Sequence, residues 1–332
     1  MKKYFTLGLS LLFLVLLVLS CKDEVVQPIG LSNMSRVASW SQLNYTSTNT
    51  FSGSNIFTKR SNALAAYGDT LAFVVGSGNY NAPENLQIWK FEAQKNNFQL
   101  QNYQLPDYRT GAVSFVVGSK LFYGLGINSS GFFNTMYLKN AGLSWSDVGF
   151  TGAARSNAVS FVIGNKAYIG LGTNGTSYLR DFYEMDASTS TFVWRKIADL
   201  PGSGRTDACA FVLNGRAYVG TGYNGVNYLN DFWEYTPTTN TWMQIGNIPG
   251  IERDDAVAFA FEKRGYIGTG WNNYTGILSD FYEYNPTTGK WKAAPSIQSS
   301  GRYGAVAFTQ KGRAYVGCGN NAADLNDFWI SK

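Results

Sequence analysis

The stretch LNDFWEY at residues 229–235 places two carboxylates and three aromatic rings within seven positions. Paired carboxylates serve as general acid and base in sugar chemistry, so the stretch has the composition of a catalytic dyad or a carbohydrate site. Similar stretches occur as LRDFYEM at 179–185, LSDFYEY at 278–284 and LNDFWI at 325–330. A motif that occurs four times is first explained by a repeated architecture, so the repeat is defined before any chemistry is assigned.

An arginine precedes each copy by about 25 residues and opens the frame R-x-x-A-(V/C)-x-F, and two further arginines open less regular copies. The arginines are spaced by 46 to 50 residues and are Arg60, Arg109, Arg155, Arg205, Arg253 and Arg302. The second apolar run of each repeat ends in a glycine pair, namely Gly76/Gly78, Gly124/Gly126, Gly170/Gly172, Gly220/Gly222, Gly268/Gly270 and Gly317/Gly319. None of these pairs opens a helical pattern, so a nucleotide site is not indicated.

Each repeat contains four short runs rich in β-branched and aromatic residues, separated by turn residues such as TPTTN at 236–240. Four strands at a period near 50 residues resemble the kelch class of β-propeller. The resemblance covers residues 39–332 and implies an all-β, six-bladed kelch propeller, similar to galactose oxidase-like kelch lipoproteins of Gram-negative bacteria. The first two repeats lack the Asp-Phe pair, and the first has an extra residue before its glycines.

The sixth repeat ends at Lys332 after its third strand, which would leave an unpaired sheet edge. The other repeats have an aromatic residue in the fourth strand (Phe98, Trp145, Trp194, Trp242 and Trp291). Trp40, in ASWSQL upstream of the first arginine, is the spare aromatic residue in a similar context. We therefore expect the N-terminal segment to supply the last strand and to close the ring.

Residues 1–20 contain two lysines followed by an apolar run, and Cys21 comes directly after them. This order is typical of a bacterial lipoprotein signal peptide with Cys21 as the lipidation site. An uncleaved membrane anchor is the alternative, for which the run is short. Residues 21–38 then form a lipidated tether, and Lys22-Asp23-Glu24 resembles the acidic tag that sends some Gram-negative lipoproteins to the cell surface. We expect an outer membrane lipoprotein, anchored by acyl chains on the surface or the periplasmic side.

The composition excludes several kinds of chemistry. The chain has no histidine, so the copper site of galactose oxidase, a kelch relative, cannot form, and we expect no cofactor and no metal. Loss of Lys2 and Lys3 with the signal would lower the net charge of +5 by two, to +3, which is not the basic balance of a nucleic-acid-binding protein. Cys209 and Cys318 occupy apolar positions in repeats that are not neighbours, so we expect no disulfide.

In a four-stranded meander the arginines and the long loops between second and third strands share one face. The resemblance implies that this face binds partners and that arginines line the channel mouth, so all six arginines are candidate ligand-binding residues. Tyr223 and Trp271 are the loop aromatics assigned to the same site, and further loop aromatics are Tyr80, Phe132, Phe133, Tyr178, Tyr228 and Tyr274. The structural alternative is that each arginine contacts the aspartate of the motif and that the aromatics cover neighbouring loops.

The predicted function is a non-catalytic surface or periplasmic binding module for a glycan or protein ligand. Arg60 and Arg109 belong to the repeats without the aspartate, although Asp107 could offset Arg109, and they form a hypothetical positive sector for an acidic ligand. One alternative is a sialic acid-type mutarotase that uses the same face, with Glu252, Asp254 or Asp255 as acid or base. The other is a purely structural assembly protein.

Overall fold

The computed structural model describes residues 36–48, 57–68, 70–76, 83–298 and 300–332. The chain divides into two compact units, Met1–Met34 and Ser35–Lys332, and only the second contains described residues. The predicted signal peptide, Cys21, most of the tether and Tyr80 lie outside the described residues. Within the described ranges, no helix is long and apolar enough to span a membrane.

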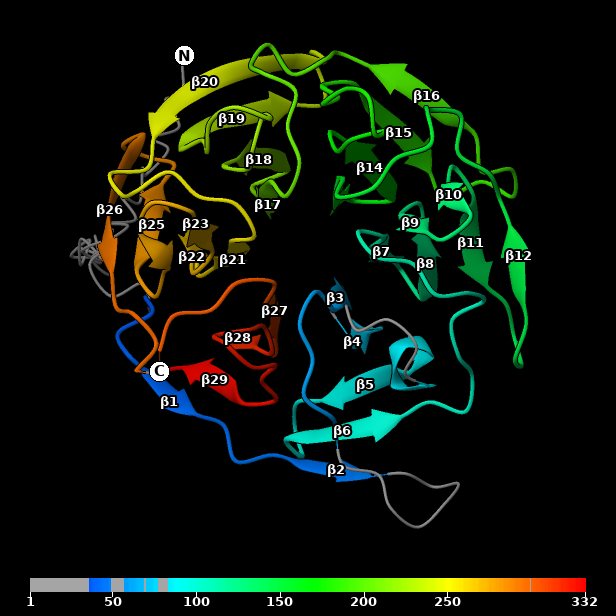
Figure 1. Cartoon of the computed structure of the whole chain (residues 1–332), viewed down its shortest axis with the longest axis horizontal. Helices are drawn as coiled ribbons and strands as arrows, with labels where there is room; N and C mark the ends of the chain where they lie inside the picture. The colour runs from blue at the N-terminus through cyan, green and yellow to red at the C-terminus, as the bar shows by residue number, and fades with distance from the viewer. Residues whose placement is uncertain (1–35, 49–56, 69, 77–82, 299) are drawn as a thin grey trace, which may run out of the picture. The chain divides into compact units, whose positions relative to one another are not determined.

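In the described residues, six sheets of four or five strands surround a central axis, which confirms the predicted six-bladed β-propeller (Figure 1). From the inner to the outer strand, blades 1 to 3 are β3 (Leu64–Tyr67), β4 (Ala72–Val75), β5 (Ile88–Glu92) and β6 (Asn97–Leu100); β7 (Val113–Val117), β8 (Lys120–Gly124), β11 (Met136–Lys139) and β12 (Trp145–Asp147); β13 (Val159–Ile163), β14 (Lys166–Gly170), β15 (Phe182–Asp186) and β16 (Trp194–Ile197). Blades 4 to 6 are β17 (Cys209–Leu213), β18 (Arg216–Gly220), β19 (Asp231–Thr236) and β20 (Thr241–Asn247); β21 (Val257–Phe261), β22 (Arg264–Gly268), β25 (Phe281–Asn285) and β26 (Lys290–Ala294); β27 (Val306–Gln310), β28 (Arg313–Gly317), β29 (Phe328–Ser331) and β1 (Trp40–Gln42).

Short elements decorate the loops between the second and third strands. The hairpins β9 (Ile127–Asn128) with β10 (Gly131–Phe132) and β23 (Trp271–Asn272) with β24 (Gly276–Ile277) lie in blades 2 and 5, and the 3-10 helix η2 (Pro83–Leu86) precedes β5. The inner strands contact one another in the cyclic order β3, β7, β13, β17, β21, β27 and back to β3. Every repeat therefore presents the start of its inner strand, where the arginine stands, to the same end of the central channel. We call this end the loop end and the opposite one the turn end.

The N-terminal segment runs outside blades 6 and 1 (Figure 1). Strand β1 pairs antiparallel with β29, with Trp40 opposite Ser331. Strand β2 (Thr46–Thr48) then pairs parallel with β6, so blade 1 has a fifth strand. Nothing in the sequence repeat indicated β2. The segment thus joins the last blade to the first through two separate backbone pairings.

Repeated aromatic residues build the core between blades. Within a blade, an inner-strand phenylalanine stacks on a second-strand tyrosine, as Phe211 does on Tyr218 with 4.8 Å between ring centroids. The fourth-strand tryptophan packs on the third-strand phenylalanine of the preceding blade, as Trp242 does on Phe182 at 4.8 Å. Trp40 has the same environment, at 5.5 Å from Phe281, and its Nε1 donates to the Pro295 carbonyl oxygen at 2.9 Å.

Candidate functional site

The six repeat arginines are buried, although they were assigned to ligand binding. Their relative exposure is 5% for Arg109 and 0% for the other five. In every blade the arginine Nη1 donates to the carbonyl oxygen of the residue sixteen positions later, at 2.9 to 3.2 Å. That residue lies at the centre of the glycine motif and has φ between 57° and 66° in all six blades. The arginines therefore hold six left-handed turns in place, and the structure does not present them to a ligand at the channel mouth.

In blades 3 to 6 each arginine also binds the aspartate of the DF motif in its own blade. The Nη2–Oδ2 distance is 2.9 Å in all four pairs, which are Arg155–Asp181, Arg205–Asp231, Arg253–Asp280 and Arg302–Asp327. Burial alone would raise the pKa of these aspartates, but the hydrogen bonds and charge of the arginines outweigh it and lower the pKa. The structural alternative for the arginine and aspartate pair is thus confirmed.

The hypothetical positive sector of blades 1 and 2 is wrong. Arg109 makes a bidentate pair with Asp107, with Nε–Oδ1 and Nη2–Oδ2 distances of 2.7 Å, and its guanidinium lies 3.9 Å from the Phe133 ring centroid. Arg60 donates from Nε and Nη2 to the carbonyl and hydroxyl oxygens of Thr58. Partners from the preceding link thus replace the missing third-strand aspartate, so neither Arg60 nor Arg109 is free for an acidic ligand, and the exposed charge beside them is that of Lys59.

The stretch LNDFWEY is explained residue by residue as scaffold. Asp231 holds Arg205 and also accepts a hydrogen bond from Trp233 Nε1 at 2.7 Å. Phe232 and Tyr235 are buried in the aromatic core between blades. Glu234 is buried and pairs with Arg216 of the neighbouring strand. Every side chain that suggested sugar chemistry therefore has a partner within the scaffold.

The glycine motif is structural as well, and its register in blade 1 differs from the prediction. A Cβ at the first glycine would lie inside the third-strand phenylalanine ring, 2.3 Å from Phe232 at Gly220. In blade 1, Val75 pairs with Leu64 as Gly124 pairs with Val113, so Gly76 corresponds to the central residue of the motif. The first repeat therefore has no extra residue before its glycines.

The loops at the loop end are held rigidly by asparagines. In blade 4 the Asn224 Oδ1 accepts hydrogen bonds from the backbone amides of Val226 and Asn227, at 3.0 and 2.8 Å. Asn174 and Asn272 accept equivalent bonds in blades 3 and 5. Asparagine is suited to such turns because its side chain replaces a backbone acceptor. The loops are thereby fixed before any ligand binds.

An aromatic row, defined as Tyr178, Tyr223, Tyr228 and Trp271, crosses these loops from blade 3 to blade 5. Successive ring centroids are 6.0, 5.0 and 5.6 Å apart. A Cβ at Gly225 would lie 2.4 Å from the Tyr178 ring, so Tyr178 covers the loop tip of the next blade. Tyr178 nevertheless remains 41% exposed, and Val226 on the next loop is 75% exposed. The predicted residues Tyr223 and Trp271 are thus brought together, and the row both packs the loops and faces solvent.

A ring of left-handed residues, which the sequence reading missed, surrounds the loop end of the channel. Each member of the ring lies two residues after a repeat arginine and has a φ between 48° and 59°. The members are Asn62, Gly111, Asn157, Asp207, Asp255 and Gly304. Backbone hydrogen bonds link ring members of neighbouring blades, such as Asn157 N to Gly111 O at 2.8 Å. The signal was available, because glycine, asparagine and aspartate tolerate this conformation best and occupy the position in all six repeats.

The ring borders a cavity of about 480 Å³ that is acidic rather than basic. Burial raises the pKa of Asp207, and burial with the charge of Asp207 raises the pKa of Asp255 well above its usual range. Burial and the same charge raise the pKa of Asp254 to about 7. Asp254, which precedes Asp255 but is not among the residues that line the cavity, can exchange protons near neutral pH, and the described lining of the cavity contains no cation for the carboxylate of a sugar acid.

Other chemistry has little support in the described residues. They contain no group of three or more cysteine, aspartate or glutamate side chains that could hold a metal ion. Cys209 and Cys318 are buried and free, as the sequence predicted.

Residues 61–250, more than half of the chain, match the family described as the KLHDC2/KLHL20/DRC7 Kelch-repeats domain. No curated protein matches the chain.

Proposed function

Because the chain belongs to the kelch-repeat family, whose propellers generally bind protein partners, we propose that it is a non-catalytic binding module whose ligand docks over the loops of blades 3 to 5. The aromatic row is the observation that carries this proposal. Its rings rest on loops fixed by Asn174, Asn224 and Asn272, so little loop entropy is lost on binding. Aromatic side chains on a rigid support are the groups that dominate the energetics of protein interfaces.

The surroundings of the row favour a protein ligand over a glycan. Exposed aliphatic side chains accompany the rings, with Val226 at 75% and Ile277, which pairs with Trp271, at 36% relative exposure. Tyr178 and Tyr223 meet at an interplanar angle of 86°, and Tyr228 and Trp271 at 80°, so the rings do not form a flat platform for sugar faces. An apolar protein surface fits such a relief better than a hydrated glycan does.

Site-specific photo-crosslinking in the full chain, within its native membranes, tests the proposal. A photoreactive amino acid at Val226 should give a discrete crosslinked protein product, whereas Leu143, which is 63% exposed in the link between β11 and β12, serves as the matched control. The Tyr178→Ala substitution should weaken the Val226 product several-fold. Equal products at Val226 and Leu143 would contradict the proposal, and selective retention on a glycan array without a protein product would favour the glycan ligand instead.

A mutarotase remains the second candidate because a carboxyl with a raised pKa, Asp254, is adjacent in sequence to Asp255 of the loop-end cavity. Asp254, with a pKa of about 7, has the proton affinity of a general acid or base at neutral pH. Since the six arginines are buried, this cavity would suit a neutral sugar better than a sugar acid. The test is anomer exchange measured by NMR with the full chain and with the Asp254→Asn variant. Exchange no faster than in buffer would eliminate this candidate.

We also propose that the protein is a lipoprotein of the bacterial outer membrane, on the surface or the periplasmic side. The support is the order of lysines, apolar run and Cys21 in the sequence. Labelled fatty acid should be incorporated into the chain and lost in the Cys21→Ala variant. Membrane retention with unchanged labelling of that variant would overturn this part of the proposal.

A further inference from the structure

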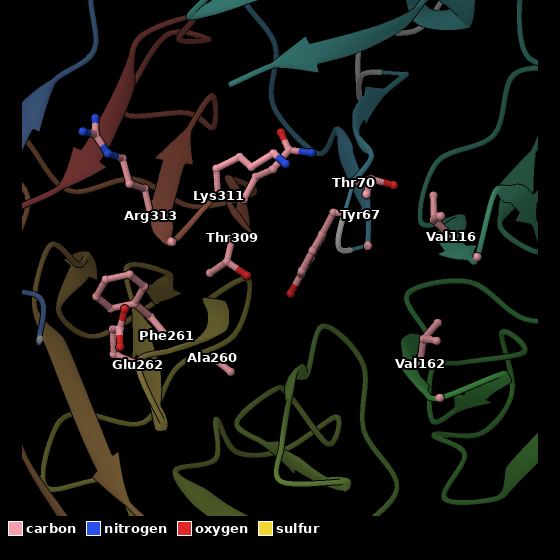
Figure 2. A pocket seen from close by; sticks show the side chains of 15 residues that line it. Tyr67, Thr70, Val116, Val162, Ala260, Phe261, Glu262, Thr309, Lys311 and Arg313 are labelled. Atoms are coloured by element: carbon pink, nitrogen blue, oxygen red, sulfur yellow. The ribbon is translucent and has the colours of Figure 1, made fainter. Parts of the chain in front are cut away.

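The turn end of the channel is asymmetric. The residue seven positions after each repeat arginine lines the channel, and it is apolar in blades 2 to 5 (Val116, Val162, Val212 and Ala260). Blades 1 and 6 have Tyr67 and Thr309 at this position. Figure 2 shows both hydroxyl groups directed into the pocket from neighbouring blades. The seam between blades 6 and 1 therefore supplies the hydroxyl groups at this level of the channel, while Glu262 of blade 5 places a carboxylate on the rim of the same cavity.

Positive charge without a local partner accompanies this seam. Blades 3 to 5 carry a basic residue eleven positions after the repeat arginine, and it pairs with the third-strand glutamate, as in Lys166–Glu184 at 2.9 Å. In blade 6 the basic residue is Arg313, but the glutamate is replaced by Ile330, which stands opposite Tyr315 as Glu184 stands opposite Tyr168. In the described part of the chain neither Arg313 nor the exposed Lys311 forms an ion pair.

Gln310 supplies an independent indication of a ligand. Its side chain is only 5% exposed, and its Oε1 is buried with no hydrogen-bond partner among the described residues. A buried acceptor left in this state costs about 1 to 3 kcal/mol, and a hydrogen-bond donor on a ligand would remove that cost. Gln310 borders both the turn-end cavity of about 820 Å³ and a second cavity of about 180 Å³ beside blade 1, as do Thr70 and Lys311.

The groups differ in what they can offer a ligand. Burial raises the pKa of Tyr67 to about 12, so its hydroxyl stays protonated and can donate a hydrogen bond. Figure 2 shows Lys311 reaching toward the blade that carries Tyr67 and Thr70, while Arg313 points away from the centre of the pocket. Lys311 is therefore the cation placed to meet an anionic group. The opposite wall, with Val116, Val162 and Ala260, offers apolar contact.

We propose that the turn end of the channel, at the seam of blades 6 and 1, is a second binding site, for a small hydroxylated carboxylate of about monosaccharide size. Lys311 binds the carboxylate, Gln310 Oε1 accepts a hydrogen bond from a ligand hydroxyl, and Tyr67 and Thr309 exchange hydrogen bonds with the remaining hydroxyls. The cavity volume lies within the range of about 300 to 1,000 Å³ that small-molecule sites occupy. The site lies at the opposite end of the channel from the aromatic row, so it does not depend on the function proposed above.

Calorimetric titration of the detergent-solubilised full chain with galacturonate, galactose and inorganic phosphate tests this site. Galacturonate and galactose share a hydroxyl pattern and differ in the carboxylate. Galacturonate should bind saturably, and the Lys311→Gln variant should bind it about 10-fold more weakly, the loss expected for one charge-assisted hydrogen bond. Lys263→Gln removes an exposed lysine from the equivalent turn of blade 5, outside the cavity lining, and should change the affinity less than 2-fold.

A stability measurement keeps the proposal testable apart from affinity. Without ligand, Gln310→Leu should leave the melting temperature unchanged or raise it, because an acceptor without a partner is replaced by a side chain of similar size. A lower melting temperature would assign Gln310 a structural role and overturn its role here. The proposal also fails if none of the three compounds binds saturably, if galactose or phosphate binds as tightly as galacturonate, or if Lys263→Gln weakens binding as much as Lys311→Gln.

Discussion

Replacement of Asp231 by asparagine tests whether the repeated acid is scaffold. The Asp231 carboxylate accepts hydrogen bonds from Arg205 Nη2 at 2.9 Å and from Trp233 Nε1 at 2.7 Å. The Arg205 side chain is 1% exposed, whereas that of Asp231 is 19% exposed. An asparagine removes the negative charge and turns an NH₂ group toward donors. The variant therefore leaves a buried guanidinium with a neutral partner that satisfies it only in part.

The loss of unfolding free energy expected for Asp231→Asn follows from the burial of the ion pair. Removal of one partner of a buried ion pair costs about 3 to 5 kcal/mol. Water can reach the one-fifth of Asp231 that is exposed, and the Thr221 carbonyl oxygen still accepts a bond from Arg205, so we expect a loss of about 3 kcal/mol in the free energy of unfolding at pH 7. Asp147→Asn, at an exposed position of β12, is the matched control and should change it by less than about 0.5 kcal/mol.

The pH dependence sharpens the prediction. Burial would raise the pKa of Asp231, but the hydrogen bonds and charge of Arg205 outweigh it, so the folded pKa lies below the unfolded value of about 3.9. The stability that this carboxylate contributes is then present above pH 4 and is lost as the pH falls through the folded pKa. Urea unfolding of the wild type and of Asp231→Asn should show a difference in unfolding free energy that is constant from pH 5 to 7 and becomes smaller below pH 4. A difference in unfolding free energy that does not depend on pH would refute the scaffold assignment. So would a variant that loses the Val226 crosslink although its urea midpoint equals that of the wild type.

Two further predictions concern Asp254 and Trp40. The pKa of Asp254 is raised to about 7, so its contribution to the free energy of unfolding is present below pH 4 and is lost as the pH rises through 7. The Asp254→Asn variant should therefore gain stability relative to the wild type between pH 5 and pH 8, by about 1 kcal/mol after solvent screening. If the melting temperatures of variant and wild type differ by the same amount at both pH values, the prediction is contradicted. Trp40 is 4% exposed and packs on Phe259 and Phe281, so the Trp40→Ala variant should lose about 3 to 5 kcal/mol of unfolding free energy, measured with urea. The Trp40→Phe variant loses mainly the hydrogen bond to Pro295 and should lose about 1 kcal/mol. A similar loss in both variants would mean that ring packing is not what stabilises this strand.

The repeat made most of the fold predictable, because the repeated residues are the ones that pack. The period, the four strands per blade and the pairing of Arg205 with Asp231 all follow from residues that recur at fixed spacing. Strand β2 could not be predicted, since its sequence TST lies outside the repeated frame and it pairs in parallel with β6 through backbone groups. The accessibility of the arginines was also beyond the sequence, because a guanidinium at the start of an inner strand can face the channel or the blade. The direction in which the guanidinium points depends on which backbone carbonyl groups the loops present to it.

Departures from the repeat indicate a site only where the structure does not compensate for them. Arg60 and Arg109 lack the aspartate of the motif, yet Thr58 and Asp107, two positions earlier in the chain, supply other acceptors. Those link residues lie outside the strand pairing, so they can supply an acceptor in place of one missing from the third strand. Arg313 has no such repair, because its lost partner is a strand residue, Ile330, whose side chain is fixed by the register of β28 and β29. The turn before β28 contains no acid and instead supplies a second cation, Lys311. The uncompensated departure therefore lies at the turn end of the channel, and this is the physical reason for placing the second ligand there rather than among the arginines.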